Sequence, residues 1–185
     1  MEAKGAVFMS IRTATQADIP AMLAIYQPYV EHTAYSFEYQ LPTQAEFLAR
    51  FQAHIAQCPW LVWEEDGVVL GYAYAGNAFV RAAYNWAAEI SVYLHPDCQR
   101  RGIGRQLYAA IEPILREQGY QVVYAVITTA NAGSIAFHTA LGYAVTATFP
   151  RCGYKLGQWH GVVWMEKRLN RDEHPAHFPV PWSTV

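Results

Sequence analysis

Apolar residues recur at helical spacing near the N-terminus and at shorter, alternating spacing further along the chain. The helical repeat covers the ranges from Ile19 to Val30 and from Thr43 to Ile55. Pro28 should bend or end the first helix, because proline lacks the backbone N–H that a helix needs. Thr43 and Glu46 have the spacing of a capping box, which predicts the start of the second helix.

Shorter apolar runs predict strands, and they are expected at 11–14, 60–64, 69–76, 89–95, 121–128, 143–149 and 162–165. Two more helices are expected, from Ile103 to Glu117 with a bend at Pro113, and from Asn131 or Ser134 to Leu141. Strands and helices do not alternate regularly in this order. The pattern therefore indicates an α+β fold with a mixed sheet.

The length and composition favour one folded domain. The chain has 185 residues, of which 53% are hydrophobic and 15% charged, enough to build a large core. Helix and strand patterns run from about residue 10 to residue 169, which we assign to the domain. Residues 1–9 are expected to be an N-terminal extension, and residues 170–185, which contain prolines, a C-terminal extension.

Charge and cysteine content exclude several classes of partner. A net charge of -2 argues against a broad nucleic-acid-binding face. The chain has neither a signal-peptide pattern nor an apolar run long enough to cross a bilayer, so we expect no membrane partner. The 3 cysteines form no CxxC pair and the 7 histidines no metal-ligand pattern. We therefore expect a cytoplasmic protein with reduced thiols and no bound metal.

A glycine-containing turn at 99–104 lies between an expected strand and an expected helix. Gly102 and Gly104 leave room for a ligand near the backbone, and the N–H groups that begin the helix can bind phosphate oxygens. The cations beside the turn are Arg100, Arg101 and Arg105. A plain turn before a surface helix is the alternative. The glycine spacing matches neither the dinucleotide fingerprint GxGxxG nor the P-loop.

The string Gln-Arg-Arg-Gly-Ile-Gly at 99–104 resembles motif A of the GCN5-related N-acetyltransferase (GNAT) superfamily. The segment 131–143, which begins with Asn131 and ends with Gly142-Tyr143, is similar to motif B of that family. The resemblance implies a mostly antiparallel sheet of about six or seven strands with about four flanking helices. It also implies that two central strands splay apart to admit acetyl-CoA.

The same resemblance implies which residues bind the co-substrate. The turn would hold the pyrophosphate, and the preceding strand would pair with the pantetheine arm. The residues expected to bind acetyl-CoA are Val92, Tyr93, Leu94, Arg100, Arg101, Gly102, Ile103, Gly104, Arg105, Asn131 and Ser134. Asn131 and Ser134 have an alternative role as ordinary helix caps.

Two further segments, 81–94 and 153–160, are similar to the phosphinothricin acetyltransferase group. Members acetylate the α-amine of small amino-acid analogues such as phosphinothricin, methionine sulfone and methionine sulfoximine, and are usually homodimers. The resemblance therefore implies a small amine substrate and a homodimer. It also places Lys155 and His160 in a segment at the dimer interface.

Two residues are candidates for proton transfer. Glu89 begins the strand that would carry acetyl-CoA, and a buried carboxylate there would be a suitable base for the amine. The alternative is a carboxylate at the surface or paired with an arginine. His138 lies in motif B where many GNAT members have tyrosine, so it is the candidate acid. A structural histidine is the alternative.

The candidate substrate-binding residues come from two loops. Arg81 could bind a carboxylate through a bidentate pair. Tyr35 and Phe37 lie where the group has a loop that covers the substrate, and Tyr84 and Trp86 could wall the pocket. Core packing is an equally good explanation for each aromatic residue.

Two other functions stay open at this stage. A GNAT enzyme could act on a different amine, such as a protein N-terminus or a polyamine. The segment 77–86 has no carboxylate, which disfavours a polyamine. A non-catalytic acetyl-CoA sensor would keep the turn but lose the base, and Glu89 disfavours it.

Overall fold

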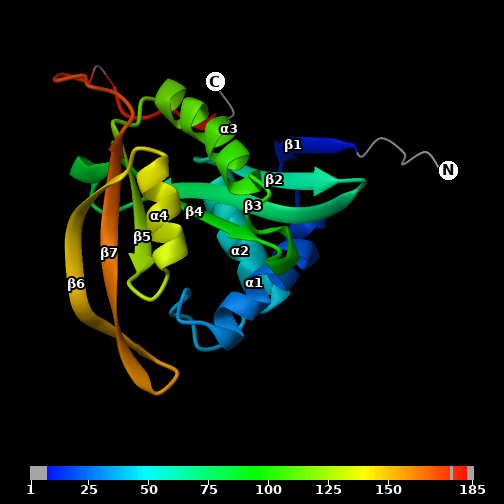
Figure 1. The fold of residues 1–185 in the computed structure, drawn as a ribbon. Helices are drawn as coiled ribbons and strands as arrows, with labels where there is room; N and C mark the ends of the chain where they lie inside the picture. Colours follow the sequence, from blue (N-terminus) through cyan, green and yellow to red (C-terminus); the bar gives the residue numbers. More distant parts are fainter. Residues whose placement is uncertain (1–7, 176, 183–185) are drawn as a thin grey trace.

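A seven-stranded sheet in the order β1-β2-β3-β4-β5-β7-β6 runs through the computed structural model, which describes residues 8–175 and 177–182 (Figure 1). The strands are β1 (Met9–Thr13), β2 (Trp60–Glu65), β3 (Val68–Asn77), β4 (Ala87–Leu94), β5 (Val122–Thr128), β6 (Ala144–Lys155) and β7 (Gln158–Arg168). The helices are α1 (Ile19–His32), α2 (Gln44–Ile55), α3 (Ile103–Gln118) and α4 (Ala132–Ala140). The expected α+β fold with a mixed sheet is confirmed.

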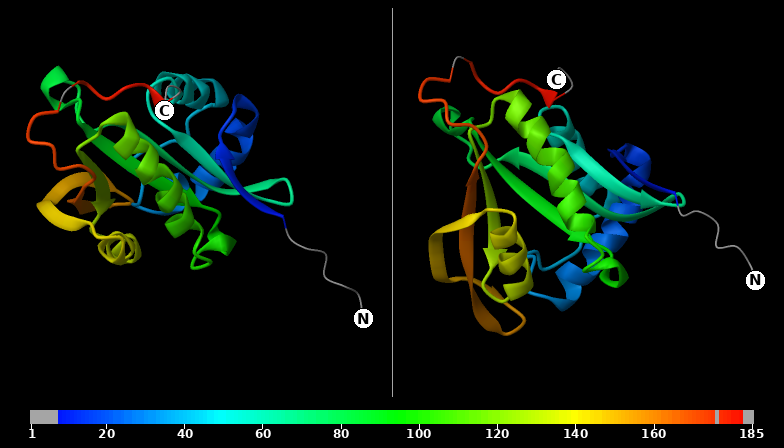
Figure 2. Two further views of the ribbon diagram at one scale, coloured as in Figure 1. Left: turned by 90° about the horizontal axis from the view of Figure 1, so that it is seen from above. Right: turned by 45° about the horizontal axis from the view of Figure 1, so that its top comes forward.

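The helices cover both faces of the sheet, α1 and α2 on one and α3 and α4 on the other (Figure 2). Side chains alternate between the two faces along each strand. Ala73 and Ala88 face α3, and their small size lets that helix pack closely on the sheet. Tyr72 and Tyr93 face α1 and α2. The two faces therefore have separate hydrophobic cores.

The strand β4 is parallel to β5, and every other neighbouring pair in the sheet is antiparallel. The parallel pairing lasts for only three positions and ends at Glu89 opposite Tyr124. Beyond that point β4 follows β3 and β5 follows β7. The expected splay is confirmed, and it opens a gap in the middle of the sheet.

Three boundaries differ from the sequence prediction. The helix α1 continues past Pro28 to His32, so an end at this proline was wrong. Burial of its apolar face outweighs the one backbone hydrogen bond that proline removes. Met9 is the first residue of β1 rather than part of an extension, and residues 1–7 lie outside the described residues.

The third difference is the length of the last hairpin. We expected strands at 143–149 and 162–165, but β6 and β7 continue to a turn at Leu156 and Gly157. Pro150 interrupted the apolar alternation on which the prediction rested. It is tolerated because β6 is an edge strand and its register shifts between Phe149 and Gly153.

The C-terminal arm packs along α2 and α3. The backbone N–H of Val180 donates to the Gln118 carbonyl at 2.9 Å, and the indole of Trp182 donates to the Ile55 carbonyl at 2.6 Å. The side-chain amide of Gln118, which is fully buried, donates to the Val180 carbonyl at 2.7 Å. These bonds tie the arm to the ends of both helices. No helix among the described residues is long and apolar enough to span a bilayer.

Candidate active site

The gap between β4 and β5 exposes a backbone edge. A hydrogen bond from the His95 N–H to the Leu70 carbonyl shows which residues of β4 face β3. Such residues alternate in an antiparallel ladder. The backbone groups of odd-numbered residues therefore bond to β3, and those of Ile90, Val92 and Leu94 turn towards the gap.

This alternation separates the three strand residues that the sequence assigned to acetyl-CoA. Val92 offers its backbone N–H and carbonyl to the gap. The Leu94 carbonyl already accepts a hydrogen bond from the Tyr29 hydroxyl at 2.6 Å. The backbone of Tyr93 pairs with Tyr72, so only its side chain can meet a ligand. Val92 is therefore the strand residue best placed to bond to an extended chain.

The turn at 99–102 leads into α3 with two left-handed residues, Arg100 at φ 62° and Gly102 at φ 81°. Gly102 is the N-cap of α3 and provides no side chain to cap it. The first N–H groups of the helix are therefore available to an anion. Gly104 has a different purpose, because a Cβ there would lie 3.3 Å from the Phe137 ring. It permits α4 to pack closely.

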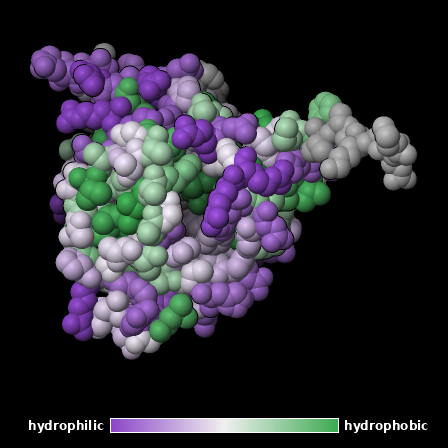
Figure 3. Space-filling model, in the orientation of Figure 1, coloured by the Kyte–Doolittle hydropathy of each residue, from purple (hydrophilic) through white to green (hydrophobic). Residues whose placement is uncertain are grey.

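The arginines at this turn have different surroundings. Arg101 forms an ion pair with Glu65 at the end of β2, and its guanidinium also donates to the Cys98 sulfur at 3.4 Å. Arg100 and Arg105 are exposed, and neither forms an ion pair with a described residue. Hydrophilic side chains gather over this end of α3 (Figure 3). Arg100 and Arg105, which have no ion pair in the part of the chain described, are therefore the cations best able to reach a phosphate.

The helix α4 begins beside the gap, on the side opposite β4. The side-chain oxygen of Asn131 accepts a hydrogen bond from the Ser134 N–H at 3.0 Å, which caps the helix. Within the described structure, the Asn131 amide nitrogen donates no hydrogen bond. Both residues line the cleft described next. The cap role and a role in binding the pantetheine arm are compatible, because each uses a different atom of the amide.

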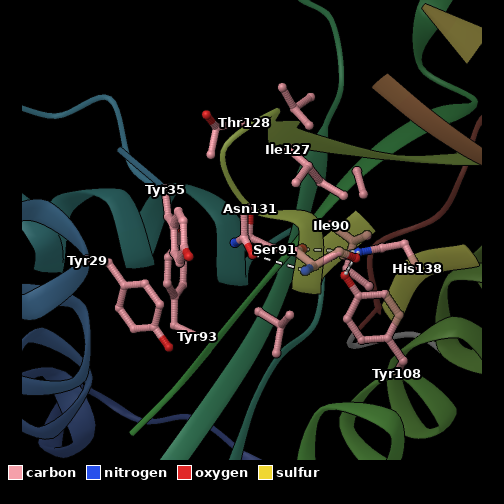
Figure 4. Close-up of a pocket in the computed structure, with 14 residues that line it drawn as sticks. Tyr29, Tyr35, Ile90, Ser91, Tyr93, Tyr108, Ile127, Thr128, Asn131 and His138 are labelled. Carbon is pink, nitrogen blue, oxygen red and sulfur yellow. Dashed lines mark hydrogen bonds between the residues drawn. The ribbon is translucent and has the colours of Figure 1, made fainter. Parts of the chain in front are cut away.

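A solvent-open cleft lies at the gap, with about 470 Å³ of empty space, and its lining residues come from both faces of the sheet (Figure 4). Tyr29, Tyr35 and Tyr93 line it on the α1 face, and Tyr108 and His138 line it on the α3 face. Its remaining lining residues are Ile90, Ser91, Val92, Ala125, Val126, Ile127, Thr128, Asn131 and Ser134. The cleft therefore brings side chains from both faces of the sheet to the gap.

One buried polar atom in this cleft lacks a partner. The hydroxyl of Thr128, at the end of β5, has no hydrogen-bond partner among the described residues. Buried hydroxyls are nearly always bonded. An elongated ligand with polar amide groups between β4 and β5 would supply the missing bond. The gap, the uncapped end of α3 and this hydroxyl together fit a molecule with a diphosphate and a polar arm.

Glu89 occupies the last position at which β4 and β5 still pair. Its side chain shares the face of Ser91 and Tyr93, by strand alternation, and therefore lies on the α1 side of the sheet. Burial raises the pKa of Glu89, and no ion pair involves it among the described residues. The sequence left open that Glu89 is fully exposed or paired with an arginine, and the structure shows neither arrangement among the described residues. Glu89 is half-buried and adjoins Ile90, which lines the cleft together with Ser91.

His138 is buried, and both of its ring nitrogens are engaged. Its Nδ1 lies 2.8 Å from the Ser134 carbonyl, which can only accept, so Nδ1 carries the proton. The Nε2 atom is then an acceptor, and the Tyr108 hydroxyl donates to it at 2.8 Å. Burial lowers the pKa of His138, which favours this neutral form. His138 therefore fixes the orientation of Tyr108 in the cleft (Figure 4).

The substrate candidates are divided between three places. Tyr35 lines the cleft. Arg81 and Tyr84 line a separate open groove of about 960 Å³. Phe79 also lines this groove, and its ring lies 6.0 Å from that of Tyr124, the residue opposite Glu89 in the sheet. Phe37 packs instead against the β6–β7 hairpin.

Trp86 belongs to none of these pockets. Its indole donates to the His177 carbonyl at 3.0 Å, and its ring stacks on Phe178 at 4.7 Å. Trp86 therefore packs against the C-terminal arm and does not form the pocket wall for which the sequence suggested it.

Sequence reasoning missed Tyr29 and Tyr108. Both fitted the apolar repeats of their helices, and we interpreted Tyr29 only as part of a core-facing stripe. Their hydroxyls contact Leu94 and His138, which are distant in the sequence. A periodic pattern gives no signal for such contacts, although buried tyrosines commonly need a partner for the hydroxyl.

Comparison with known proteins agrees with this geometry. The model of the Acetyltransferase (GNAT) domain matches residues 11–164. The phosphinothricin N-acetyltransferase of Streptomyces viridochromogenes is 38% identical over 159 residues, 86% of this chain and 87% of that protein. The L-methionine sulfoximine/L-methionine sulfone acetyltransferase of Salmonella typhimurium is 38% identical over 91% of this chain and 98% of its own length.

A solved structure adds the co-substrate. The phosphinothricin acetyltransferase of Sinorhizobium meliloti, a GNAT superfamily protein in complex with acetyl-CoA, matches with a TM-score of 0.85. The match covers 93% of each chain at 32% identity. The molecule with a diphosphate and a polar arm is therefore acetyl-CoA, and the fold and the co-substrate expected from motifs A and B are confirmed. The chain is an acetyl-CoA-dependent N-acetyltransferase and belongs to the GNAT family.

Proposed function

We propose that this enzyme acetylates the α-amine of a small amino-acid analogue of the phosphinothricin, methionine sulfone or methionine sulfoximine type. One observation carries the proposal: Glu89, a half-buried carboxylate without an ion pair among the described residues, adjoins the cleft-lining residue Ile90 and turns its side chain to the face opposite α3. Arg81 in the adjoining groove is a cation suited to the substrate carboxylate. The names of the relatives support the same substrate class.

Each residue then has a defined part in the reaction. Acetyl-CoA supplies an activated acetyl thioester. Glu89 accepts the proton of the attacking amine, directly or through a water. The Val92 N–H can donate to an oxygen that gains negative charge in the gap. The Tyr108 hydroxyl, which His138 holds beside the cleft, exchanges its bond to Nε2 for one to the departing sulfur and so stabilises the coenzyme A thiolate as it leaves.

The assignment of Tyr108 gives a direct prediction. Tyr108→Phe removes the hydroxyl and leaves the ring, so kcat should fall about tenfold while the Kd of acetyl-CoA stays within about twofold. Steady-state kinetics and calorimetric titration with acetyl-CoA would measure the two values. Tyr143→Phe is the control, since that hydroxyl donates to Glu112 at 3.0 Å outside the cleft. Equal kcat values for Tyr108→Phe and the wild type would contradict the assignment.

The substrate class can be tested with a panel of amines. We expect thiol release from acetyl-CoA with methionine sulfone, methionine sulfoximine and phosphinothricin, and much less with a polyamine or a peptide N-terminus. Preference for the peptide would replace the proposed substrate class. Binding of acetyl-CoA without turnover on any amine would favour the sensor.

We also propose a homodimer in the cytoplasm. Half-exposed apolar side chains gather on the last hairpin, which is a surface that a second copy could bury: Val145, Phe149, Tyr154, Leu156 and Trp159. Cys58 and Cys98 are buried free thiols, as expected in a reducing compartment. Light scattering coupled to gel filtration would give the oligomeric state.

A further inference from the structure

Lys155 is a buried cation that the steps above do not use. It lies at the end of β6, and the residue is only 3% exposed. Its ammonium donates to the Val30 carbonyl at 2.6 Å and the Ser36 carbonyl at 2.7 Å. None of the described carboxylates forms an ion pair with it. The resemblance placed this residue at a dimer interface, whereas the structure buries its ammonium within its own chain.

Burying an ammonium is costly unless its protons form hydrogen bonds, so the positions of the two carbonyls that accept from Lys155 are informative. Val30 lies in the last turn of α1, where helix carbonyls lack an intrahelical partner. Ser36 lies in the following loop, between Tyr35 and Phe37. Lys155 therefore joins the hairpin to the loop that brings Tyr35 to the cleft.

Neighbouring contacts join the same two segments. A Cβ at Gly153 would lie 2.3 Å from the Phe37 ring, so that ring occupies the space left by the glycine. The Tyr39 hydroxyl donates to the Tyr154 carbonyl. His160 is also part of the contact, because its ring lies 6.3 Å from that of Phe37.

The loop has little else to hold its backbone. Within the described structure, residues 34–41 form no hydrogen bonds between backbone groups. The side chains of Thr33 and Ser36 bond to nearby N–H groups, which shapes the turns but does not attach the loop to the sheet. Its attachment therefore depends on the hairpin, on the Tyr26 hydroxyl 2.6 Å from Ser36 Oγ, and on the ion pair of Glu38 with Arg50 of α2.

We propose that Lys155 is a positioning residue that holds the loop of residues 33–39 over the amine side of the cleft. The inference rests on the proposed function, because Tyr35 of this loop lines the cleft on the face to which the Glu89 side chain turns. A loop that is closed for only part of the time weakens apparent substrate affinity by that fraction. Binding lost equally by the ground state and the transition state raises KM and leaves kcat unchanged.

The test is Lys155→Met, which keeps an unbranched side chain of nearly the same length but removes the ammonium. If the loop is then closed about a tenth of the time, KM for methionine sulfone rises about tenfold, with kcat and the acetyl-CoA Kd within about twofold. Hydrogen exchange should become faster at residues 33–39. Lys155→Arg keeps N–H donors and should give an intermediate KM.

Lys167→Met is the control, because Lys167 is a partly buried lysine that bonds to Glu112 at 2.6 Å, away from the loop. It should leave KM and loop exchange unchanged. Gly153→Ala is a second variant that does not disturb a buried charge. Its methyl group displaces the Phe37 ring, so KM and loop exchange should rise here too.

The outcomes are distinct. Wild-type enzyme without turnover on the amine panel defeats the proposed function, and loop exchange in the variants still decides the role of Lys155. Unchanged exchange at residues 33–39 in Lys155→Met overturns the inference, as does a fall in kcat with KM unchanged. If Lys155→Met does not fold, an unchanged KM and exchange in Gly153→Ala overturns it.

Discussion

Replacing Glu89 with glutamine should lower kcat/KM for the amine by about two to three orders of magnitude at neutral pH. The substitution keeps the shape of the side chain and its place where β4 and β5 part. It removes only the ability to accept a proton. The Kd of acetyl-CoA should stay within about threefold, because the turn before α3 is untouched.

The pH dependence follows from the pKa of this carboxyl. Burial raises the pKa of Glu89, so the ionised form that acts as base appears at higher pH than for an exposed glutamate. Wild-type kcat/KM should therefore rise with pH through this raised pKa. The Glu89→Gln variant should lack that limb and follow only the ionisation of the amine.

Stability should change in the opposite direction to activity. A raised pKa in the folded state gives stability that is present below the unfolded-state pKa and is lost as pH rises through the folded-state value. At neutral pH the partial burial of the ionised Glu89 therefore costs stability, and Glu89→Gln should be at least as stable as the wild type. Urea unfolding at pH 7 would measure this.

Glu166→Gln is a suitable control for both measurements. Glu166 lies on β7 opposite Tyr124, in the same sheet, and has no part in the proposed reaction. The Glu166→Gln variant should keep the kcat and KM of the wild type. If Glu89→Gln retained more than a third of wild-type kcat/KM between pH 6 and 8, Glu89 would not be the base.

The parts of the site that the sequence predicted are local in the chain. Gly102 and Asn131 follow rules of turns and helix caps that operate over a few residues, and the structure gives them those geometries. The alternation of apolar residues likewise located β4 and β5. Local patterns of this kind predicted the elements and their order.

The parts that the sequence did not predict depend on contacts between distant residues. Tyr108 meets His138 thirty positions later, and Trp86 meets His177 ninety-one positions later. Lys155 bonds to carbonyls more than a hundred residues before it. Carbonyl partners leave no trace in the sequence, because every residue type has one.

The second large effect is expected at the turn before α3. Gly102→Val should weaken acetyl-CoA binding about a hundredfold, since losing two charge-assisted hydrogen bonds costs about 3 kcal/mol. Gly102 has φ 81°, where a branched side chain is strained, so valine should pull the turn out of the shape that presents the first N–H groups of α3.

Gly67→Val separates this effect from simple strain. Gly67 has φ 80° and, like Gly102, empty space around the position of a Cβ, but it lies in the β2–β3 hairpin. Both variants should lose similar stability in urea unfolding, about 1–2 kcal/mol. Calorimetric titration should show weak acetyl-CoA binding only for Gly102→Val. Equal affinities in the two variants would mean that the α3 turn does not hold the diphosphate, because the backbone strain is matched and only the turn differs.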